Sequence, residues 1–219
     1  MKPLSTQEAA SLIEGGAIVI DTRPSAVFMS GFVPGSLHIP LSDQLSAYAE
    51  LTLDPEYTAI LIAEAGQEET ASRSFIKTGV VSVAGYIDGG YEAWTAAGGA
   101  TDIIIDIDAE EFAIDYKFDE FYLIDTRPDE DYEAEHIEYA ESIPLSDIEE
   151  NTPALSTAAS YYIYGKTIED AAFAASLFRR AEFQKVRVIS ASYEDLKANP
   201  DITILKKKKT KQDSKFSDN

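Results

Sequence analysis

The sequence predicts two α/β domains in tandem, each a parallel sheet with helices on both faces. A length of 219 residues suits two domains of about 100 residues. One block of sequence recurs at a constant offset, and apolar runs alternate with helical patterns through both halves. The composition, 45% hydrophobic and 26% charged, is that of a folded globular protein.

The repeated block is IVIDTRPSAVFMSGFVPGSLHIPLSD at 18–43 and YLIDTRPDEDYEAEHIEYAESIPLSD at 122–147. The two copies align at an offset of 104 without a gap, and ten of 26 positions are identical. Two such blocks at one offset indicate a duplication. We therefore expect homologous domains over 4–99 and 102–205, with the boundary near Gly98-Gly99.

The elements follow in the same order in each half. Ser5-Thr6-Gln7-Glu8 is a capping box that begins a helix, and Gly15-Gly16 ends it. Buried strands are expected at 17–21, 58–63, 80–84, 102–107, 121–125, 160–164 and 185–189. Helices are expected at 42–51, 67–77, 90–97, 109–115, from 146 onward, and at 167–180 and 192–198. This alternation is typical of parallel sheets covered on both faces.

Charge restricts the partners. The net charge is −21, and the last 14 residues hold six Lys and two Asp, so residues 1–205 carry 12 basic and 37 acidic side chains. A body with a net charge of −25 repels nucleic acids and anionic membranes, so we expect neither as a partner. No apolar run approaches the ~20 residues of a membrane span, and no signal-peptide pattern is present, which favours a cytoplasmic location.

The basic segment 206–219 (KKKKTKQDSKFSDN) has almost no apolar content. We expect a disordered tail there. A contact of its lysines with an acidic partner, or with the acidic body itself, is the alternative.

The chain contains no cysteine. This excludes disulfides, thiolate metal ligands and thiol nucleophiles within these residues. Motifs for phosphate loops, dinucleotide binding, serine hydrolases and zinc proteases are also missing from the sequence. We expect no cofactor and no metal site.

The repeated motifs resemble those of the rhodanese-like family, in tandem over about 1–205. The first half has Asp21-Thr22-Arg23, Phe28 and Gly31-Phe32-Val33-Pro34-Gly35-Ser36, followed by Gly89-Gly90-Tyr91-Glu92-Ala93-Trp94 near its end. The second half has Asp125-Thr126-Arg127, Tyr132, Glu135-His136-Ile137-Glu138-Tyr139-Ala140 and a degraded end motif, Ser190-Ala191-Ser192-Tyr193-Glu194-Asp195-Leu196. The pair is also similar to the rhodanese-like region of bacterial metallo-β-lactamase/rhodanese fusion proteins. The resemblance implies two rhodanese-like domains.

The resemblance also implies where a catalytic loop belongs. In this family a cysteine follows the central strand, and successive backbone N–H groups cradle an anion and stabilise the thiolate that carries sulfur as a persulfide. The first loop is Ala63, Glu64, Ala65, Gly66, Gln67, Glu68 and Glu69, with Ala63 at the cysteine position. The second is Gly165, Lys166, Thr167, Ile168, Glu169, Asp170 and Ala171, with Gly165 there. Neither position can carry sulfur.

The charges of these loops also disfavour anion binding. The first loop has three glutamates, and acids at a helix N-terminus can themselves occupy the positive end of the helix dipole. We expect Glu68, Glu69, Glu169 and Asp170 to act in this way, so that both loops are degenerate active sites converted into helix caps.

The other notable residues are expected to be structural. Each Asp-x-Arg pair ends a strand and can pair internally, His38 and His136 lack metal-ligand spacing, and Trp94 is expected in a core. We therefore expect no enzyme activity. The hypothesis is an inactive tandem rhodanese-like module of bacterial type with a binding, structural or regulatory role in sulfur metabolism, beside a protein partner or a fused hydrolase domain.

Two alternatives stay open. The chain could be the rhodanese-like part of a metallo-β-lactamase-type hydrolase or persulfide-handling enzyme whose active site lies outside it. It could also use the remnant clefts for chemistry that needs no thiol.

Overall fold

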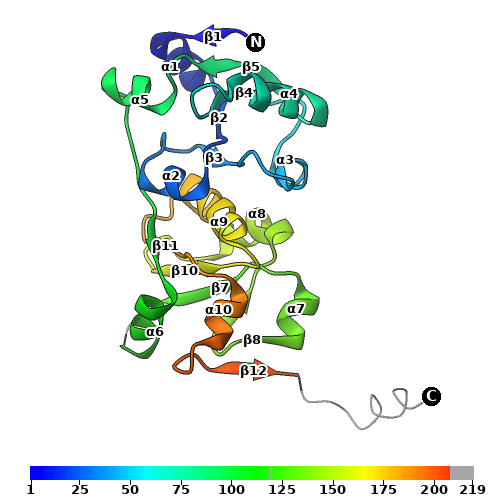
Figure 1. Ribbon diagram of the computed structural model, residues 1–219, viewed down its shortest axis with the longest axis vertical. Coiled ribbons are helices and arrows are strands. Elements are labelled where there is room, and N and C mark those ends of the chain that lie inside the picture. Colours follow the sequence, from blue (N-terminus) through cyan, green and yellow to red (C-terminus); the bar gives the residue numbers. More distant parts are fainter. Residues whose placement is uncertain (119, 208–219) are drawn as a thin grey trace, which may run out of the picture.

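The computed structural model describes residues 1–118 and 120–207. These residues form two five-stranded parallel sheets with strand orders β1-β5-β4-β2-β3 and β6-β11-β10-β7-β9. The same order in both sheets confirms the predicted pair of homologous α/β domains. Figure 1 shows the first domain above the second, with β1 and β12 at opposite ends of the molecule.

The first domain alternates strands and helices throughout. Its strands are β1 (Pro3–Leu4), β2 (Ile18–Asp21), β3 (Leu37–His38), β4 (Thr58–Ile62) and β5 (Ser82–Ile87). Its helices are α1 (Thr6–Glu14), α2 (Ser25–Ser30), α3 (Leu45–Thr52), α4 (Glu68–Thr78) and α5 (Gly90–Ala96).

The second domain repeats this plan and adds a small antiparallel sheet of two strands. Its strands are β6 (Ile105–Ile107), β7 (Tyr122–Asp125), β8 (Glu135–Ile137), β9 (Ala140–Ser142), β10 (Tyr161–Tyr164), β11 (Val186–Ile189) and β12 (Ile204–Lys206). Its helices are α6 (Ala109–Phe118), α7 (Asp129–Ala134), α8 (Ile148–Asn151), α9 (Ile168–Arg180) and α10 (Tyr193–Ala198), with 3₁₀ turns η1 (Leu145–Asp147) and η2 (Thr152–Ala154).

Several expected boundaries were wrong. The strand expected at 80–84 is β5, which runs on to Ile87 because β1 pairs with its last residues, Leu4 opposite Ile87. The strand expected from 102 begins at Ile105, because Asp102 instead forms an antiparallel bridge with Phe32 of the first domain. The short helices α2 and α7 and the short strands β1, β3, β8, β9 and β12 were not expected, since such elements are too short to show a periodicity.

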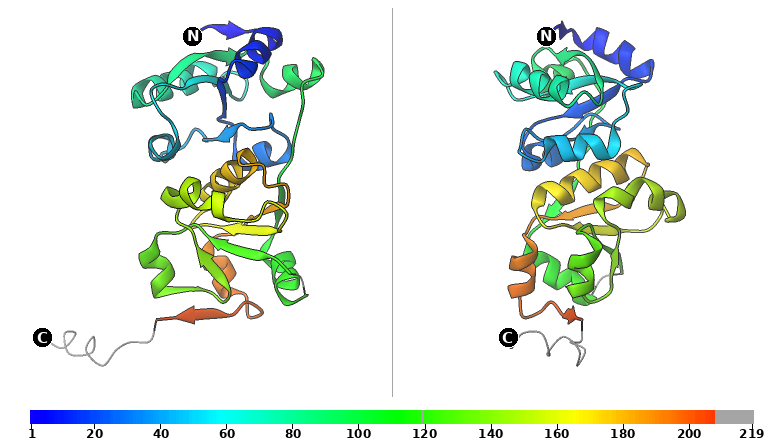
Figure 2. Two further views of the ribbon diagram at one scale, coloured as in Figure 1. Left: turned by 180° about the vertical axis from the view of Figure 1, so that it is seen from behind. Right: turned by 90° about the vertical axis from the view of Figure 1, so that its right-hand side faces the viewer.

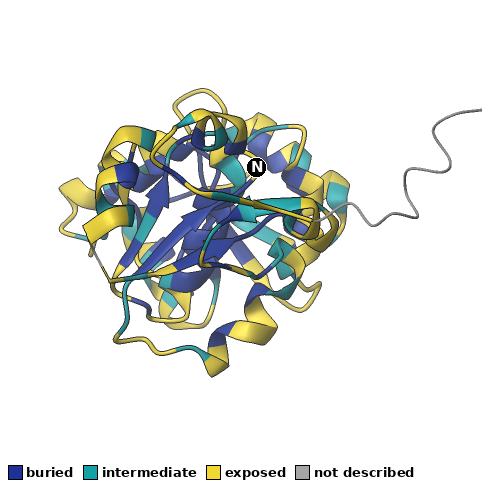
Figure 3. Ribbon diagram, turned by 90° about the horizontal axis from the view of Figure 1, so that it is seen from below, coloured by how far each residue is buried: buried dark blue, intermediate teal, exposed yellow. Residues whose placement is uncertain are grey.

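Alternate strand residues face different cores. In the first sheet Ile18 and Leu61 belong to one apolar cluster, whereas Val19 and Ile60 belong to another that contains Trp94 from α5. This is the period of two that a strand buried on both faces requires. Figure 3 shows the buried strands surrounded by helices with exposed outer faces.

Helix α9 joins the two domains. All eight residues from Ala171 to Phe178 are buried, because one side of the helix covers its own sheet and the other packs against β3 and α2 of the first domain. Phe173 stacks on Tyr48 of α3, with 4.5 Å between ring centroids. The backbone N–H of His38 donates to the Ser176 hydroxyl at 3.1 Å. A helix that is apolar all round is typical of such a doubly covered position. Figure 2 shows α9 between the two domains in both views.

The basic segment is ordered further than expected. β12 pairs antiparallel with β8 and ends at Lys206, which lies opposite Glu135. The Lys207 N–H donates to the Ala134 carbonyl, and its ammonium lies 3.1 Å from Glu133. The disorder expected from 206 is therefore wrong for these two lysines, because the acidic side chains beside β8 pair with them. The rest of that segment, 208–219, lies outside the described residues, and the limits 4–99 and 102–205 stay a prediction.

The described ranges contain no helix that is long and apolar enough to cross a membrane.

Candidate functional site

Both loops singled out in the sequence follow the central strand of a sheet. Ala63 comes directly after β4 and is buried, and Gly165 comes directly after β10 and is buried as well. Parallel strands bring their carboxyl ends to one edge, where ligand sites of α/β sheets are found. The positions are therefore equivalent, and the side chains on the two loops decide what each can do.

The first loop is an exposed turn. The Gln67 N–H donates to the Glu64 carbonyl at 2.9 Å, with Ala65 and Gly66 between them, and Gly66 has a φ of +84°. A glycine at the third position of such a turn is needed because other residues are strained at positive φ. Within this loop the N–H of Gln67 is thus engaged inside the turn and not turned toward a shared anion.

The start of α4 has no side-chain cap. Glu68 and Glu69 lie in the first turn, but no side chain of the loop accepts a hydrogen bond from the N–H groups there. Glu69 instead pairs with Arg73, one turn further along, at 2.6 Å. In this domain the acids can favour the helix only through its dipole, which is the role expected for them and stays a prediction; what this loop lacks is a side-chain hydrogen bond to the helix start.

The second loop does form a cap. Asp170 Oδ2 accepts hydrogen bonds from the Thr167 N–H at 3.0 Å and from the Thr167 hydroxyl at 2.8 Å, and the Asp170 N–H donates back to Thr167 Oγ1 at 3.1 Å. This reciprocal capping box satisfies N–H groups that an anion would otherwise have to reach. Lys166, Thr167 and Ile168 are exposed, whereas Ala171 is fully buried.

Gly165 has no room for a side chain. A Cβ atom at this position would lie 2.7 Å from the Cβ of Asp170 and 2.9 Å from Oγ1 of Thr126. Both neighbours are held in place, Asp170 by the capping box and Thr126 by its bond to the Tyr164 carbonyl at 2.9 Å. The second loop therefore has no space for a side chain at this position.

The Asp-x-Arg pairs are buried, closed ion pairs beneath the loops. Arg23 binds Asp21 through two nitrogens, with Nε 2.9 Å from Oδ1 and Nη2 2.6 Å from Oδ2, and Nη2 also donates to the Gly31 carbonyl. Arg127 repeats this arrangement with Asp125 and the Glu135 carbonyl. Such forked pairs balance both charges internally, and side-chain exposures of 4% and 5% leave little of Arg23 and Arg127 open to an incoming anion.

Aromatic rings cover the arginines. Arg23 lies 4.4 Å from the ring centroid of Tyr91, and Arg127 lies 3.4 Å from that of Tyr193. Burial opposes the charge of Arg127, but the Asp125 carboxylate outweighs this effect and raises the pKa of Arg127. The Arg127 guanidinium thus stays charged inside the protein.

The geometry of both halves agrees with one family. The sequence model of the rhodanese-like domain family matches residues 5–97 and, a second time, residues 108–199. The chain belongs to the rhodanese-like family.

Known relatives include sulfurtransferases. The thiosulfate sulfurtransferase GlpE of Pseudomonas savastanoi pv. phaseolicola is 25% identical over 95 residues, which are 43% of this chain and 88% of that protein. Among solved structures, the Alr3790 protein from Anabaena sp. is 24% identical with a TM-score of 0.42, and the match covers 47% of this chain and 83% of that chain. Thiosulfate sulfurtransferase from Pseudomonas aeruginosa is 20% identical with a TM-score of 0.41, over 89% of this chain and 44% of that chain.

The two rhodanese-like domains meet at the first loop. A cavity of about 340 Å³ is lined by Glu64 and Gln67 of that loop, by Thr22 beside it, and by Glu169 from the start of α9. The fold thus brings a carboxylate of the second domain to the mouth of the first loop. Two acids facing one cavity make it unfavourable for anions.

The histidines of the rhodanese-like domains have packing roles. His38 is fully buried, stacks on Phe28, and its Nε2 lies 2.9 Å from the Ser25 hydroxyl. Burial lowers the pKa of His38 to about 3, so the ring is neutral. His136 stacks on Tyr132, and its Nδ1 lies 2.8 Å from the carbonyl of the same residue. No group of three side chains within 1–118 and 120–207 is arranged to hold a metal ion.

Sequence reasoning missed residues that shape these sites. Thr22 and Thr126 each donate to the carbonyl that ends the central strand, Ile62 and Tyr164 respectively. The signal was present, because both threonines belong to the repeated Asp-Thr-Arg motif. Tyr193 carried a signal too, because it stands in the second end motif where Tyr91 stands in the first, and each lies over an arginine. Tyr164 carried none, since its partner Asp125 is distant in the sequence.

Proposed function

We propose that this chain is a catalytically inactive tandem rhodanese-like protein that acts as a binding, structural or regulatory module linked to sulfur metabolism. The observation that carries the proposal is the lack of any cysteine, with Ala63 and Gly165 in the two positions after the central strands. Sulfur transfer by this family requires a thiolate that becomes a persulfide, and alanine and glycine supply no sulfur.

The surroundings support loss of the whole site. A carboxylate about 5 Å from a unit negative charge costs about 3 kcal/mol at an effective dielectric constant of 20. Glu64 and Glu169 both face the cavity beside the first loop, and Arg23 is already paired with Asp21. A doubly charged donor such as thiosulfate would therefore meet repulsion without a free basic partner among these residues.

A role through surfaces fits the way the domains are joined. The apolar cluster around α9 contains residues of both domains, among them Phe28 and Tyr48 of the first and Phe173 and Phe178 of the second. Such a shared core favours one rigid body over two domains that open and close around a substrate. A protein partner, in the cytoplasm that the sequence favours, would then supply the chemistry.

Purified protein tests the proposal directly. We expect no thiocyanate from thiosulfate and cyanide, no hydrolysis of p-nitrophenyl phosphate, and no added sulfur in the intact mass after exposure to thiosulfate. A cysteine-containing sulfurtransferase assayed in parallel is the positive control. Thiocyanate formation that rises in proportion to the concentration of this protein would overturn the proposal.

A further inference from the structure

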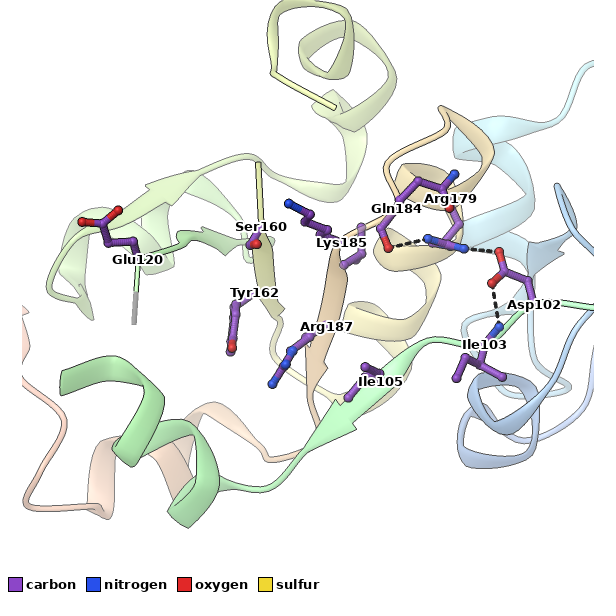
Figure 4. A pocket seen from close by; sticks show the side chains of 11 residues that line it. Asp102, Ile103, Ile105, Glu120, Ser160, Tyr162, Arg179, Gln184, Lys185 and Arg187 are labelled. Carbon is purple, nitrogen blue, oxygen red and sulfur yellow. Dashed lines mark hydrogen bonds and ion pairs between the residues drawn. The ribbon is translucent and has the colours of Figure 1, made fainter. Parts of the chain in front are cut away.

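A second hollow lies at the opposite end of the second sheet from Gly165. It has a volume of about 550 Å³ and is bounded by Ser160 before β10, by Lys185 and Arg187 at the start of β11, and by the edge strand β6. Figure 4 shows these side chains with Tyr162 and Ile105 around one space. Gly165 follows the carboxyl end of β10, so this hollow is separate from both loops.

Basic side chains are concentrated there. Residues 1–205 carry only 12 Lys and Arg against 37 acids, yet four of the 12, Arg179, Arg180, Lys185 and Arg187, fall within nine residues. Three of these four line the hollow. Two acids, Asp102 and Glu120, line it too, so its lining has one more base than acid in an otherwise strongly acidic protein. At physiological salt charges are screened beyond about 8 Å, so these nearby charges decide what binds.

The three basic side chains that line the hollow differ in how many of their N–H donors are already bonded to the protein. Arg179 is committed to the protein, since it donates to the carbonyls of Phe183 and Gln184 and pairs with Asp102. Lys185 donates one hydrogen bond, to the Ala158 carbonyl at 3.2 Å. Because its ammonium has three N–H donors, it can also bind a ligand.

Arg187 also has donors to spare. Among the described residues its one ion pair joins Nη1 to Asp115 at 3.4 Å, and Asp115 is held at the same time by the Tyr162 hydroxyl at 2.8 Å. A guanidinium has five N–H donors in a planar fork that suits a carboxylate or a sulfonate. Lys185 and Arg187 both line the hollow, and each therefore keeps N–H donors for an anionic group.

One side of the hollow is lined by apolar side chains. Ile103 and Ile105 are 58% and 48% exposed, and Val186 and Tyr162 are buried beneath them. Asp102, the acid nearest to Ile103, is neutralised by Arg179 and accepts from the Ile103 N–H at 2.8 Å. Glu120 stands at the far end from Arg179 in Figure 4, where its carboxylate disfavours a second anionic group.

We propose that this hollow binds a small organic anion, a carboxylate or a sulfonate with an attached apolar group. The anionic end lies between Lys185 and Arg187, and the apolar part covers Ile103 and Ile105. The site does not depend on the state of either loop, so it stands apart from the proposed loss of activity.

Amide NMR titrations of the full chain at low salt test the site. Benzoate and benzenesulfonate are the probes, benzamide is the neutral analogue of the same shape, and inorganic sulfate is the anion without an apolar part. We expect saturable shifts at Ile103, Ile105, Val186 and Arg187 with both aryl anions, weaker binding of sulfate, and no saturable shifts with benzamide.

Variants separate the two halves of the site. Lys185→Gln and Arg187→Gln each weaken benzoate binding by about tenfold, and Ile105→Ser weakens benzoate but leaves sulfate unchanged. The matched control is Arg73→Gln, an exposed arginine on α4 of the first domain, which leaves binding unchanged. Lys185 is exposed, so its variant folds even if Arg187→Gln does not.

Three results would overturn the proposal. One is equal binding of benzamide and benzoate. Another is unchanged affinity in Lys185→Gln. The third is saturable shifts that map to a different part of the chain.

Discussion

Tyr48 of the first domain donates a hydrogen bond of 2.8 Å to Asp170 Oδ1 at the start of α9 in the second domain. The other oxygen of the same carboxylate accepts from Thr167 within the capping box. Burial and the nearby Asp170 carboxylate raise the pKa of Tyr48, so the phenol keeps the proton that it donates. The loop that corresponds to a catalytic loop therefore works here as part of the joint between the domains.

Replacing Asp170 should cost more than the loss of a helix cap. Asp170→Ala removes the capping box and the bond to Tyr48, and we expect it to lower the free energy of unfolding by about 2–3 kcal/mol. The matched control is Asp195→Ala, because Asp195 forms the same box with Ser192 at the start of α10. That change should cost about 1 kcal/mol. Urea unfolding measures both.

The larger loss of unfolding free energy in Asp170→Ala is attributable to the bond with Tyr48 only if the effects of Asp170→Ala and Tyr48→Phe are not additive. Tyr48→Phe should destabilise the wild-type protein but add little to Asp170→Ala. Equal losses in Asp170→Ala and Asp195→Ala would contradict a role of this bond in holding the domains together.

Gly165→Ala should destabilise the protein although it adds one methyl group. The new Cβ would lie 2.7 Å from the Asp170 Cβ, and overpacking of this kind costs about 1–3 kcal/mol. Ala63→Ser serves as the comparison, because position 63 already carries a Cβ. The melting temperature measures both changes. An unchanged value for Gly165→Ala would show that the second loop keeps space for a side chain.

Ala63→Cys should yield a thiol without sulfur-transfer activity. Burial of position 63 raises the thiol pKa, while the dipole at the start of α4 lowers it by the equivalent of about 0.3–2 kcal/mol. Glu64, Glu68 and Glu69 act in the opposite direction and also repel anionic donors. The rate of alkylation across pH reports the pKa, which we expect to be no lower than the ordinary value of about 8.5.

The neutral triple change Glu64→Gln, Glu68→Gln and Glu69→Gln in the Ala63→Cys background provides the contrast. Its thiol pKa should be lower, and thiosulfate should bind more readily. A well-depressed pKa with turnover of thiosulfate in Ala63→Cys alone would show that the first loop still cradles an anion.

His38 should make stability depend on pH in a defined window. Its pKa is about 3 in the folded protein against an ordinary 6.5, so between these values the unfolded chain binds a proton that the folded protein does not. Stability therefore falls as the pH drops below 6.5 and is regained as the pH rises. From pH 6.5 to 5 the loss should be about 1–2 kcal/mol.

Substitution isolates this effect. His38→Gln should flatten the pH dependence of the unfolding free energy between pH 6.5 and 5, whatever its effect on the absolute stability. An identical slope in wild type and His38→Gln would contradict a neutral, buried His38.

Much of the site could be predicted because it follows from local sequence. The capping box at Thr167 needs only residues three apart, and Asp170 at that spacing indicates it. The dipole role expected of Glu68 and Glu69 stays a prediction, since Gln67 precedes that helix without a side-chain cap and Glu69 pairs with Arg73. Local spacing shows that acids lie near a helix start, but the side-chain conformation decides whether they bond to it.

The sequence by itself determined the duplication, the α/β class, the lack of cysteine in this chain and the acidic character of its body. These depend on residue identity, periodicity and an offset, all of which are local or additive properties. Only the tertiary structure decided that Asp170 binds Tyr48, that a Cβ at Gly165 meets Thr126, and that Lys185 and Arg187 share a hollow with Ile105. Each of these joins residues far apart in the chain, and their distance is set by the packing of α9 between two sheets, which no local pattern encodes.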